Sequence, residues 1–194
     1  MSSPREILQS VFGYESFRFE QEKIIETVLA KHDAFVLMPT GGGKSLCYQI
    51  PSLVFPGLTV VISPLIALMK DQVDALRVAG VSAAFLNSSL AREQRNEVFS
   101  KLSSGSLKLL YLAPERLFGS GDEFISFLKT LSVSLFAIDE AHCISQWGHD
   151  FRPEYRMLGG LKKEFSGTPI IALTATADHQ TRADIIDKLG FKNP

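Results

Sequence analysis

The segment Phe35–Ile50 reads FVLMPTGGGKSLCYQI and carries the strongest fold signal of the chain. Its apolar start, Phe35–Met38, is typical of a short buried strand, and its last part has helical character. Between them stand three glycines followed by lysine and serine, the order found in phosphate-binding loops. Glycines let the backbone turn tightly and direct N–H groups at an anion, and a following helix adds its positive N-terminal end. The segment therefore predicts a phosphate-binding loop between a strand and a helix.

The polar residues of this loop have defined tasks in that interpretation. Lys44 is expected to reach the β- and γ-phosphates of a nucleotide, and the Ser45 hydroxyl to hold Mg²⁺. Met38 replaces the first glycine of the full G-x-x-x-x-G-K-[ST] pattern, whereas Gly43, Lys44 and Ser45 are intact. The alternative for this segment alone is a glycine-rich turn with a solvated lysine. The predicted cradle consists of Thr40, Gly41, Gly42, Gly43, Lys44 and Ser45.

Composition limits the classes of protein to consider. The 194 residues suffice for one good-sized domain, and the net charge of −1 argues against broad, non-specific nucleic-acid binding while leaving room for a local basic groove. No apolar run reaches the ~18 residues that span a membrane. Two distant cysteines give no disulfide framework, which favours the cytoplasm, including a bacterial nucleoid, or the nucleus. His142, Cys143 and His149 would form at most a weak zinc site, because no second ligand pair accompanies them.

Apolar runs alternate with amphipathic stretches along the chain. This alternation predicts an α/β fold with a parallel sheet and helices on both faces. Helical patterns cover 65–76, 92–102 and 179–189, and Gly80 and Gly190 end two of them. We predict one domain at 31–194 with an N-terminal helical extension at 1–30. The predicted strands are Phe35–Met38, Thr59–Ser63, Ala83–Leu86, Leu107–Leu112, Leu135–Ile138 and Pro169–Leu173.

An adjacent acid pair, Asp139 and Glu140, directly follows the strand Leu135–Ile138. A carboxylate at a strand end beside a phosphate loop can hold Mg²⁺, which is the role expected for Asp139. Glu140 is then placed to accept a proton from the water that attacks the γ-phosphate. A solvated strand end would explain the pair if it stood alone. Together with Lys44 it indicates a nucleotide hydrolase.

The segments MPTGGGKSLCYQIP and DEAH, with their surroundings, resemble RecQ-type DNA helicases of helicase superfamily 2. The resemblance covers Phe12 to about Gly190, with the motifs in the order of the family. It implies a RecA-like P-loop NTPase domain that uses ATP and Mg²⁺. It also implies DNA as the substrate, single-stranded and partly duplex, with 3′-to-5′ movement in repair and recombination.

The N-terminal stretch Phe12–Gln21 resembles the adenine-recognition motif of that family. The resemblance implies that Tyr14 stacks on the base and that Arg18 and Gln21 contact its edge. A glutamine amide can both donate to and accept from adenine. Spacing alone also fits a helix start with core aromatic residues.

Two further motifs follow strand ends and resemble contacts to a nucleic-acid strand. Ser63 and Pro64 open a helix whose exposed N–H groups can bind phosphate, although helix capping by Ser63 with Pro64 at the first helical position is an alternative. Arg116 either contacts phosphate or forms an internal ion pair. The stretch Ala172–Ala177 resembles the third helicase motif, in which Thr174 and Thr176 hydrogen-bond the acid pair. There the alternative is a strand end that runs into a helix cap.

The segment HCISQWGHDFRPEY, His142–Tyr155, places aromatic residues among polar and basic groups. Aromatic side chains in a loop suit stacking on unpaired bases. The segment resembles the aromatic-rich loop of RecQ helicases, which implies coupling of DNA contact to ATP hydrolysis. Trp147 and Phe151 filling the core is the alternative. The implied contacts are Trp147, Phe151 and Arg152, with Gln146 and His149 relaying to the nucleotide.

A complete motor of this superfamily has two such domains, and the second supplies an arginine finger. Nothing in the sequence resembles that second domain, so we expect this chain to be a first motor domain that needs a second one in cis. Two other classes remain. A small-molecule kinase would use a substrate hydroxyl, whereas the Asp139–Glu140 pair favours water. A non-catalytic nucleic-acid-binding module is disfavoured by intact Lys44 and Ser45.

Overall fold

The computed structural model describes residues 2–118, 123–192 and 194, in which a parallel sheet forms the centre. The strands lie in the order β1-β7-β6-β2-β4-β3, and every neighbouring pair runs parallel. Each strand predicted from the sequence is present, with ends that differ by at most two residues, so the predicted fold class is confirmed. The strands are β1 Ala34–Leu37, β2 Leu58–Ile62, β3 Ala83–Leu86, β4 Leu109–Leu112, β6 Val133–Ile138 and β7 Ile170–Thr174.

Helices alternate with these strands, as the amphipathic stretches predict. The last helix, α10, has the predicted bounds His179–Leu189 and ends at Gly190, whose φ of 66° lies in the left-handed region. The other α-helices are α1 Pro4–Ser10, α2 Gln21–Leu29, α3 Leu46–Val54, α4 Ile66–Val78, α5 Arg92–Ser103, α6 Pro114–Phe118, α7 Glu123–Lys129, α8 Pro153–Arg156 and α9 Leu161–Glu164, and the 3-10 helices are η1 Ala141–Ile144 and η2 Met157–Gly160.

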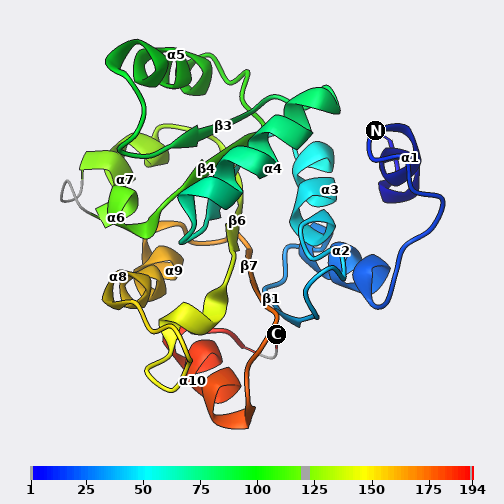
Figure 1. The fold of residues 1–194 in the computed structure, drawn as a ribbon, viewed down its shortest axis with the longest axis vertical. Coiled ribbons are helices and arrows are strands. Elements are labelled where there is room, and N and C mark those ends of the chain that lie inside the picture. Colours follow the sequence, from blue (N-terminus) through cyan, green and yellow to red (C-terminus); the bar gives the residue numbers. More distant parts are fainter. Residues whose placement is uncertain (1, 119–122, 193) are drawn as a thin grey trace.

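Helices cover both faces of the sheet (Figure 1). Successive side chains of a strand point to opposite faces, so in β2 Val60 and Ile62 join one core cluster and Val61 the other. Helices α2, α3 and α4 pack on the face of Val61, and α5 to α10 pack on the opposite face. This double coverage explains why the strands are continuously apolar rather than alternating.

The N-terminal segment contains α1 and α2. A capping box between Ser3 and Glu6 begins α1, and Leu8 packs against Ile25 of α2 and Ile50 of α3. Farther along α2, Val28 belongs to the same core cluster as the strands. The division of the chain near residue 30 stays a prediction. None of the helices in the described parts of the chain is long and apolar enough to cross a membrane.

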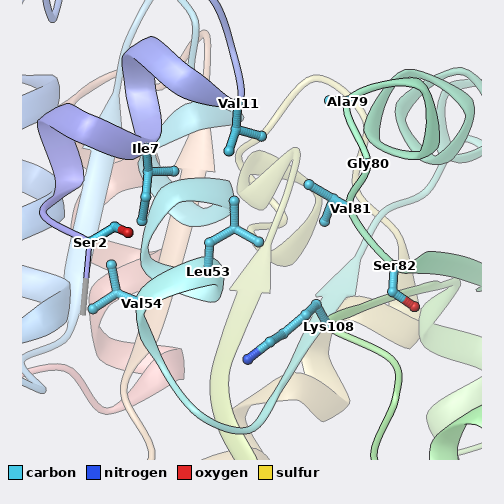
Figure 2. Close-up of a pocket in the computed structure, with 10 residues that line it drawn as sticks. All are labelled: Ser2, Ile7, Val11, Leu53, Val54, Ala79, Gly80, Val81, Ser82 and Lys108. Carbon is cyan, nitrogen blue, oxygen red and sulfur yellow. The ribbon is translucent and has the colours of Figure 1, made fainter.

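A hollow lies between α1, the end of α3 and the segments that precede β3 and β4 (Figure 2). Ile7, Val11 and Leu53 line its apolar side. At its rim, Lys108 Nζ donates to the carbonyl oxygens of Phe55 at 2.9 Å and Pro56 at 3.2 Å. The hollow adjoins the amino-terminal edge of β3 and β4, whereas ligands of open α/β sheets bind at the carboxyl edge. We therefore place the functional site elsewhere.

Candidate functional site

The predicted phosphate loop joins β1 to α3 at the carboxyl edge of the sheet. Gly41 and Gly43 both have a φ of 78°, a conformation that favours glycine. Lys44 Nζ donates to the carbonyl oxygen of Met38 at 3.2 Å, which folds the lysine back over the loop. Ser45 caps α3 without a side-chain hydrogen bond, so its hydroxyl is not engaged in capping. The loop therefore has the strand–turn–helix context that phosphate binding requires.

Gln21 connects α2 to this loop. Its side chain is 1% exposed, and Oε1 accepts a hydrogen bond from the Arg18 N–H at 2.8 Å. Its Nε2 donates to the carbonyl oxygens of Gly42 at 3.3 Å and Gly43 at 3.0 Å. The amide hydrogens are thus directed at the phosphate loop, a link that the sequence did not predict. Adenine contact by Gln21 stays a prediction.

A small hollow beside the loop brings together the residues predicted to bind adenine. Tyr14, Arg18 and Gln21 line it together with Gly41 and Gly43. The Tyr14 side chain is 48% exposed, so its ring is accessible for stacking. The hollow is continuous in its lining with the phosphate loop, as a nucleotide site requires.

The acid pair lies at the carboxyl end of β6, and both of its members are partly buried. The Asp139 N–H donates to the carbonyl oxygen of Ile62 at 2.8 Å, which fixes the strand end against β2. Burial, with a smaller contribution from Glu140, raises the pKa of Asp139 from 3.8 to about 6. The Lys44 ammonium opposes this rise in the pKa. The Lys44 ammonium and the two carboxylates after β6 therefore lie close enough to interact electrostatically.

Glu140 has a strained backbone and a fixed carboxylate. Its φ of 50° and ψ of 46° place it in the left-handed region, which is costly for a residue with a side chain. The ring Nδ1 of His142 lies 3.2 Å from Glu140 Oε2. This hydrogen bond lowers the pKa of Glu140, against the effect of partial burial. Glu140 is consequently ionised at neutral pH, as a proton acceptor must be.

His142 links the acid pair to β7. Its Nδ1 also lies 2.9 Å from Thr174 Oγ1, and Thr174 Oγ1 donates to the carbonyl oxygen of Thr176 at 3.1 Å. Because that hydroxyl proton is used, and an ionised Glu140 only accepts, the proton on His142 belongs on Nδ1. The prediction that Thr174 bonds the acid pair directly is wrong: the contact passes through His142. Thr176 is exposed.

The aromatic loop, residues 145–152, lies between η1 and α8 and directly follows the segment that contains His142. The ring of His149 stacks on His142 with centroids 4.1 Å apart. The Trp147 side chain is 62% exposed, so the alternative that Trp147 fills the core is wrong. Phe151 is half-buried, and Gln146 is exposed. The loop therefore presents an open indole two residues before His149, whose ring stacks on the histidine that contacts Glu140.

Arg152 and Tyr155 hold the far end of the loop. Arg152 binds the Asp150 carboxylate at 3.1 Å and donates to the carbonyl oxygen of Pro64 at 3.3 Å. Tyr155, grouped with the loop aromatics in the sequence, is fully buried, and its hydroxyl donates to the carbonyl oxygen of Asp139 at 3.2 Å. Tyr155 therefore supports the acid pair from behind and is not available for stacking.

Ser145 anchors the near end of the loop, a role that the sequence did not indicate. Its Oγ donates to Asp184 Oδ2 of α10 at 2.6 Å and accepts from the Trp147 N–H at 3.2 Å. No local pattern connects two residues 39 positions apart. Close by, the potential ligand atoms of His142, Cys143 and Asp150 lie within 4.8 Å of one another. Burial raises the pKa of the Cys143 thiol to about 12, so the thiolate form that metals bind is disfavoured.

The predicted nucleic-acid contacts after β2 and β4 differ from expectation. Ser63 is 2% exposed and its N–H donates to the Leu112 carbonyl oxygen at 3.1 Å, so the prediction that this N–H is open to phosphate is wrong. The capping alternative is also wrong, because α4 begins at Ile66 with Leu65 as its cap. The Arg116 guanidinium lies over the Phe124 ring, 5.2 Å from its centroid. Pro64 and Arg116 line one hollow, together with Asn87 and Arg95.

Comparison with known proteins agrees with this geometry. The family model for DEAD/DEAH box helicases matches residues 18–185. This chain belongs to the DEAD/DEAH box helicase family. Within the match lie the phosphate loop, the acid pair, the aromatic loop and the end of β7, and the helicase resemblance noted in the sequence is confirmed.

Curated helicases share most of this chain. It is 59% identical over 187 residues to the ATP-dependent DNA helicase RecQ of Haemophilus influenzae, covering 96% of this chain and 30% of the relative. The identity to the Bacillus subtilis ATP-dependent DNA helicase RecQ is 52% over 185 residues, covering 94% and 31%. This helicase domain thus spans about 30% of the length of these relatives.

Solved helicase structures share the fold. A hypothetical ATP-dependent RNA helicase from Sulfolobus tokodaii has a TM-score of 0.72 at 21% identity, covering 99% of this chain and 56% of that chain. The DUF1998 helicase MrfA bound to DNA and AMPPNP also has a TM-score of 0.72, at 15% identity, covering 96% and 28%. At these identities the likeness shows a shared fold alone.

The burial of Asp139 predicts an unusual pH dependence of stability in the metal-free helicase domain. The folded state binds this carboxyl proton more tightly than the unfolded chain, so Asp139 lowers the free energy of unfolding as pH rises from about 4 to about 6. We expect Asp139→Asn to be more stable than wild type above pH 6, by a few kcal/mol at most, with a gain that shrinks toward pH 4. Urea unfolding in EDTA between pH 4 and 7 measures this difference.

Asp187→Asn is the matched control, because Asp187 is an exposed aspartate of α10. Its stability difference from wild type should not change over the same pH range. An Asp139→Asn gain that stays constant with pH would show that Asp139 is not desolvated in solution.

Proposed function

We propose that this chain is the first motor domain of a RecQ-type ATP-dependent DNA helicase. The observation that supports this proposal most is the sheet edge that brings together Lys44, Asp139 and Glu140. A loop with an exposed Trp147 follows the acid pair. In the whole protein, ATP hydrolysis would drive 3′-to-5′ movement along single-stranded DNA and separation of the duplex, in repair and recombination. The proposed location is the bacterial nucleoid or the nucleus.

In the proposed reaction, the phosphate loop binds the triphosphate of ATP through its N–H groups and Lys44. Glu140 accepts the proton of the attacking water, because its carboxylate is ionised and fixed by His142. Tyr14, Arg18 and Gln21 hold the adenine, and the exposed Thr40 completes the loop. An adjacent second motor domain would supply an arginine finger to the γ-phosphate.

Ser45 and Asp139 fit a magnesium ion. Both offer hard oxygen donors, and Mg²⁺ binds through one or two carboxylates together with substrate phosphates and water. A cation would also stabilise the ionised form of the buried Asp139, whose pKa is otherwise raised. When bound, Mg²⁺ would neutralise charge on the phosphates. The remaining steps depend on Lys44, Glu140 and His142.

The proposed contacts to single-stranded DNA are Trp147, Phe151 and Arg152 of the aromatic loop. His149 stacked on His142 offers a path from this loop to Glu140, and Thr174 and Thr176 are bonded to it through His142. Gln146 of the loop is proposed to contribute to the same relay. Pro64 and Arg116, which line one hollow, add a second contact region. A kinase would not need an aromatic loop at the catalytic glutamate, which favours the helicase.

The hydrolysis assay tests the proposal as a whole. We expect ATP hydrolysis to be stimulated by single-stranded DNA in a version of the protein extended through a second motor domain, and to be slow or absent in this chain alone. Hydrolysis by the extended version without any response to DNA would contradict the nucleic-acid half of the proposal. Robust unwinding by this chain alone would contradict its assignment as half of a motor.

Trp147 offers a direct optical test, since it is the single tryptophan of the chain. We expect single-stranded oligodeoxythymidylate to quench its emission, because a base stacks on the exposed indole. Trp147→Ala should weaken DNA binding about tenfold, as stacking contributes ~1–3 kcal/mol per base. Fluorescence titration of the wild type and anisotropy of labelled DNA with both proteins make the measurement.

Phe19→Ala is the matched control for Trp147→Ala. Phe19 is also an exposed aromatic residue, 72% exposed, but lies just before α2 and outside the loop. It should leave DNA affinity unchanged. DNA binding that leaves the tryptophan emission constant would place Trp147 outside the contact.

A further inference from the structure

A buried polar cluster lies between the phosphate-loop helix and the middle of the sheet. We define the tyrosine–glutamine cluster as Tyr48 and Gln49 of α3, Gln72 of α4 and Tyr111 of β4. The Tyr48 and Tyr111 hydroxyls are 3.3 Å apart, and Gln49 Nε2 donates to the Tyr111 hydroxyl at 3.3 Å and to Gln72 Oε1 at 2.9 Å. The four side chains thus form one connected network.

Three of the four side chains in this cluster are almost completely buried. Tyr48 is 2% exposed, Tyr111 is 1% exposed and Gln49 is 5% exposed, and their surroundings belong to the apolar core on that face. The two rings already pack edge to face, with centroids 6.4 Å apart, and phenylalanine would keep that packing. Buried hydroxyl and amide groups cost stability unless they are bonded. The core therefore contains polar atoms that packing does not need.

Each element of the cluster continues into a functional segment. Tyr48 and Gln49 lie in the first turn of α3, three and four residues after Ser45. Tyr111 is near the end of β4, which leads into the segment containing Arg116. Gln72 lies in α4, which follows Pro64. The cluster joins the phosphate loop to both segments that we propose as a second nucleic-acid contact.

The cluster also lies behind the acid pair. Tyr111 is in register with Val61, and Val61 with Ala137, two residues before Asp139 on the same face of β6. Burial is the main cause of the raised pKa of Tyr48 and of Tyr111, so both hydroxyls keep their protons at neutral pH. The two hydroxyls therefore lie behind the strand that ends at the acid pair.

The hydroxyl hydrogens of this network can be arranged in two ways while the heavy atoms keep their positions. Either tyrosine hydroxyl can donate to the other, while Gln49 donates to Tyr111 in both cases. A nearby negative charge favours the arrangement whose hydroxyl dipoles point toward it. The cluster thus has two hydrogen-bonding states that share one set of heavy-atom positions.

We propose that the tyrosine–glutamine cluster transmits the state of the phosphate loop to the nucleic-acid contacts that follow β2 and β4. Its members are positioning residues: they touch neither nucleotide nor nucleic acid. They fix α3 relative to β4 and α4, so that closure of the loop on a triphosphate moves the two contact segments together. This inference rests on the proposed function.

The test compares Tyr48→Phe, Tyr111→Phe and the double variant in the full-length protein that carries this chain. ATP hydrolysis is measured with and without single-stranded DNA, together with nucleotide affinity. We expect basal hydrolysis and nucleotide affinity within about twofold of wild type, and a five- to tenfold loss of the DNA-stimulated rate in Tyr111→Phe, which loses two hydrogen bonds. The double variant should be no worse than Tyr111→Phe, because both substitutions break the same network.

Ser134→Ala is the control for a merely structural effect. Its hydroxyl accepts a hydrogen bond from the Gly57 N–H at 3.1 Å, near the amino-terminal end of β6. It should lower the unfolding temperature about as much as Tyr111→Phe while leaving the ratio of stimulated to basal rate unchanged. An equal loss of that ratio in Ser134→Ala would overturn the inference.

The remaining outcomes separate this inference from the proposed function. Wild-type protein that responds to DNA, with tyrosine variants that respond equally, overturns the inference and leaves the function standing. Wild-type protein that hydrolyses ATP without any response to DNA overturns the inference together with the nucleic-acid half of the proposed function. A reduced response confined to the tyrosine variants supports both.

Discussion

Glu140→Gln is expected to reduce the rate of ATP hydrolysis by about 10²- to 10⁴-fold while nucleotide still binds. Glutamine keeps the size of the side chain but cannot take the proton of the attacking water. In the wild type, the hydrogen bond from His142 keeps the pKa of Glu140 low, so the acceptor is ready at neutral pH. Steady-state hydrolysis by the full-length protein, with and without single-stranded DNA, measures the loss.

Glu97→Gln serves as the control for removal of one carboxylate. Glu97 is an exposed residue of α5 paired with Lys101 at 2.7 Å, far along the chain from the phosphate loop. It should hydrolyse ATP at the wild-type rate. Glu140→Gln with normal hydrolysis would move the catalytic base to another group, and Glu140→Gln that fails to bind a fluorescent ATP analogue would show a structural defect instead.

Gly43→Ala is expected to weaken ATP binding about 10- to 100-fold. A side chain is disfavoured at the φ of 78° that Gly43 adopts, and its Cβ would lie 2.5 Å from Gln21 Nε2. Gln21 cannot withdraw freely, because its amide is bonded to the carbonyl oxygens of Gly42 and Gly43. The substitution therefore breaks the link between α2 and the phosphate loop. Titration with a fluorescent ATP analogue measures the affinity.

Gly105→Ala separates this effect from backbone strain. Gly105 has a φ of 68°, but the space around its missing Cβ is empty. Both variants should lose about 1–2 kcal/mol of stability from the left-handed backbone, and only Gly43→Ala should lose nucleotide affinity. Equal affinities in the two variants would mean that Gln21 does not hold the loop.

Local sequence patterns were sufficient to predict the fold. Parallel strands covered on both faces are continuous apolar runs, so β2 and β7 are visible in the sequence without any knowledge of their neighbours. The carboxyl edge of such a sheet collects the loops that follow its strands. The phosphate loop and the acid pair could therefore be assigned to one site before their distance was known.

Burial and hydrogen-bond partners at that site could not be predicted in the same way. Trp147 and Tyr155 occur in one polar segment, yet the first is exposed and the second is fully buried. Spacing did not distinguish them, because the loop is irregular and has no period to follow. The backbone N–H of Ser63 was expected to be available to a phosphate, but it donates to a carbonyl oxygen of β4 instead.

By itself, then, the sequence determined the parallel α/β fold, the order of the motifs and the residues that carry charge at the site. Only the tertiary structure decided that Gln21 ties α2 to the phosphate loop, that Thr174 reaches the acid pair through His142, and that Tyr48 meets Tyr111. The physical reason is range. Strand and helix patterns arise from neighbours within a few residues, whereas these hydrogen bonds join atoms 21 to 63 positions apart, brought together by packing against the sheet.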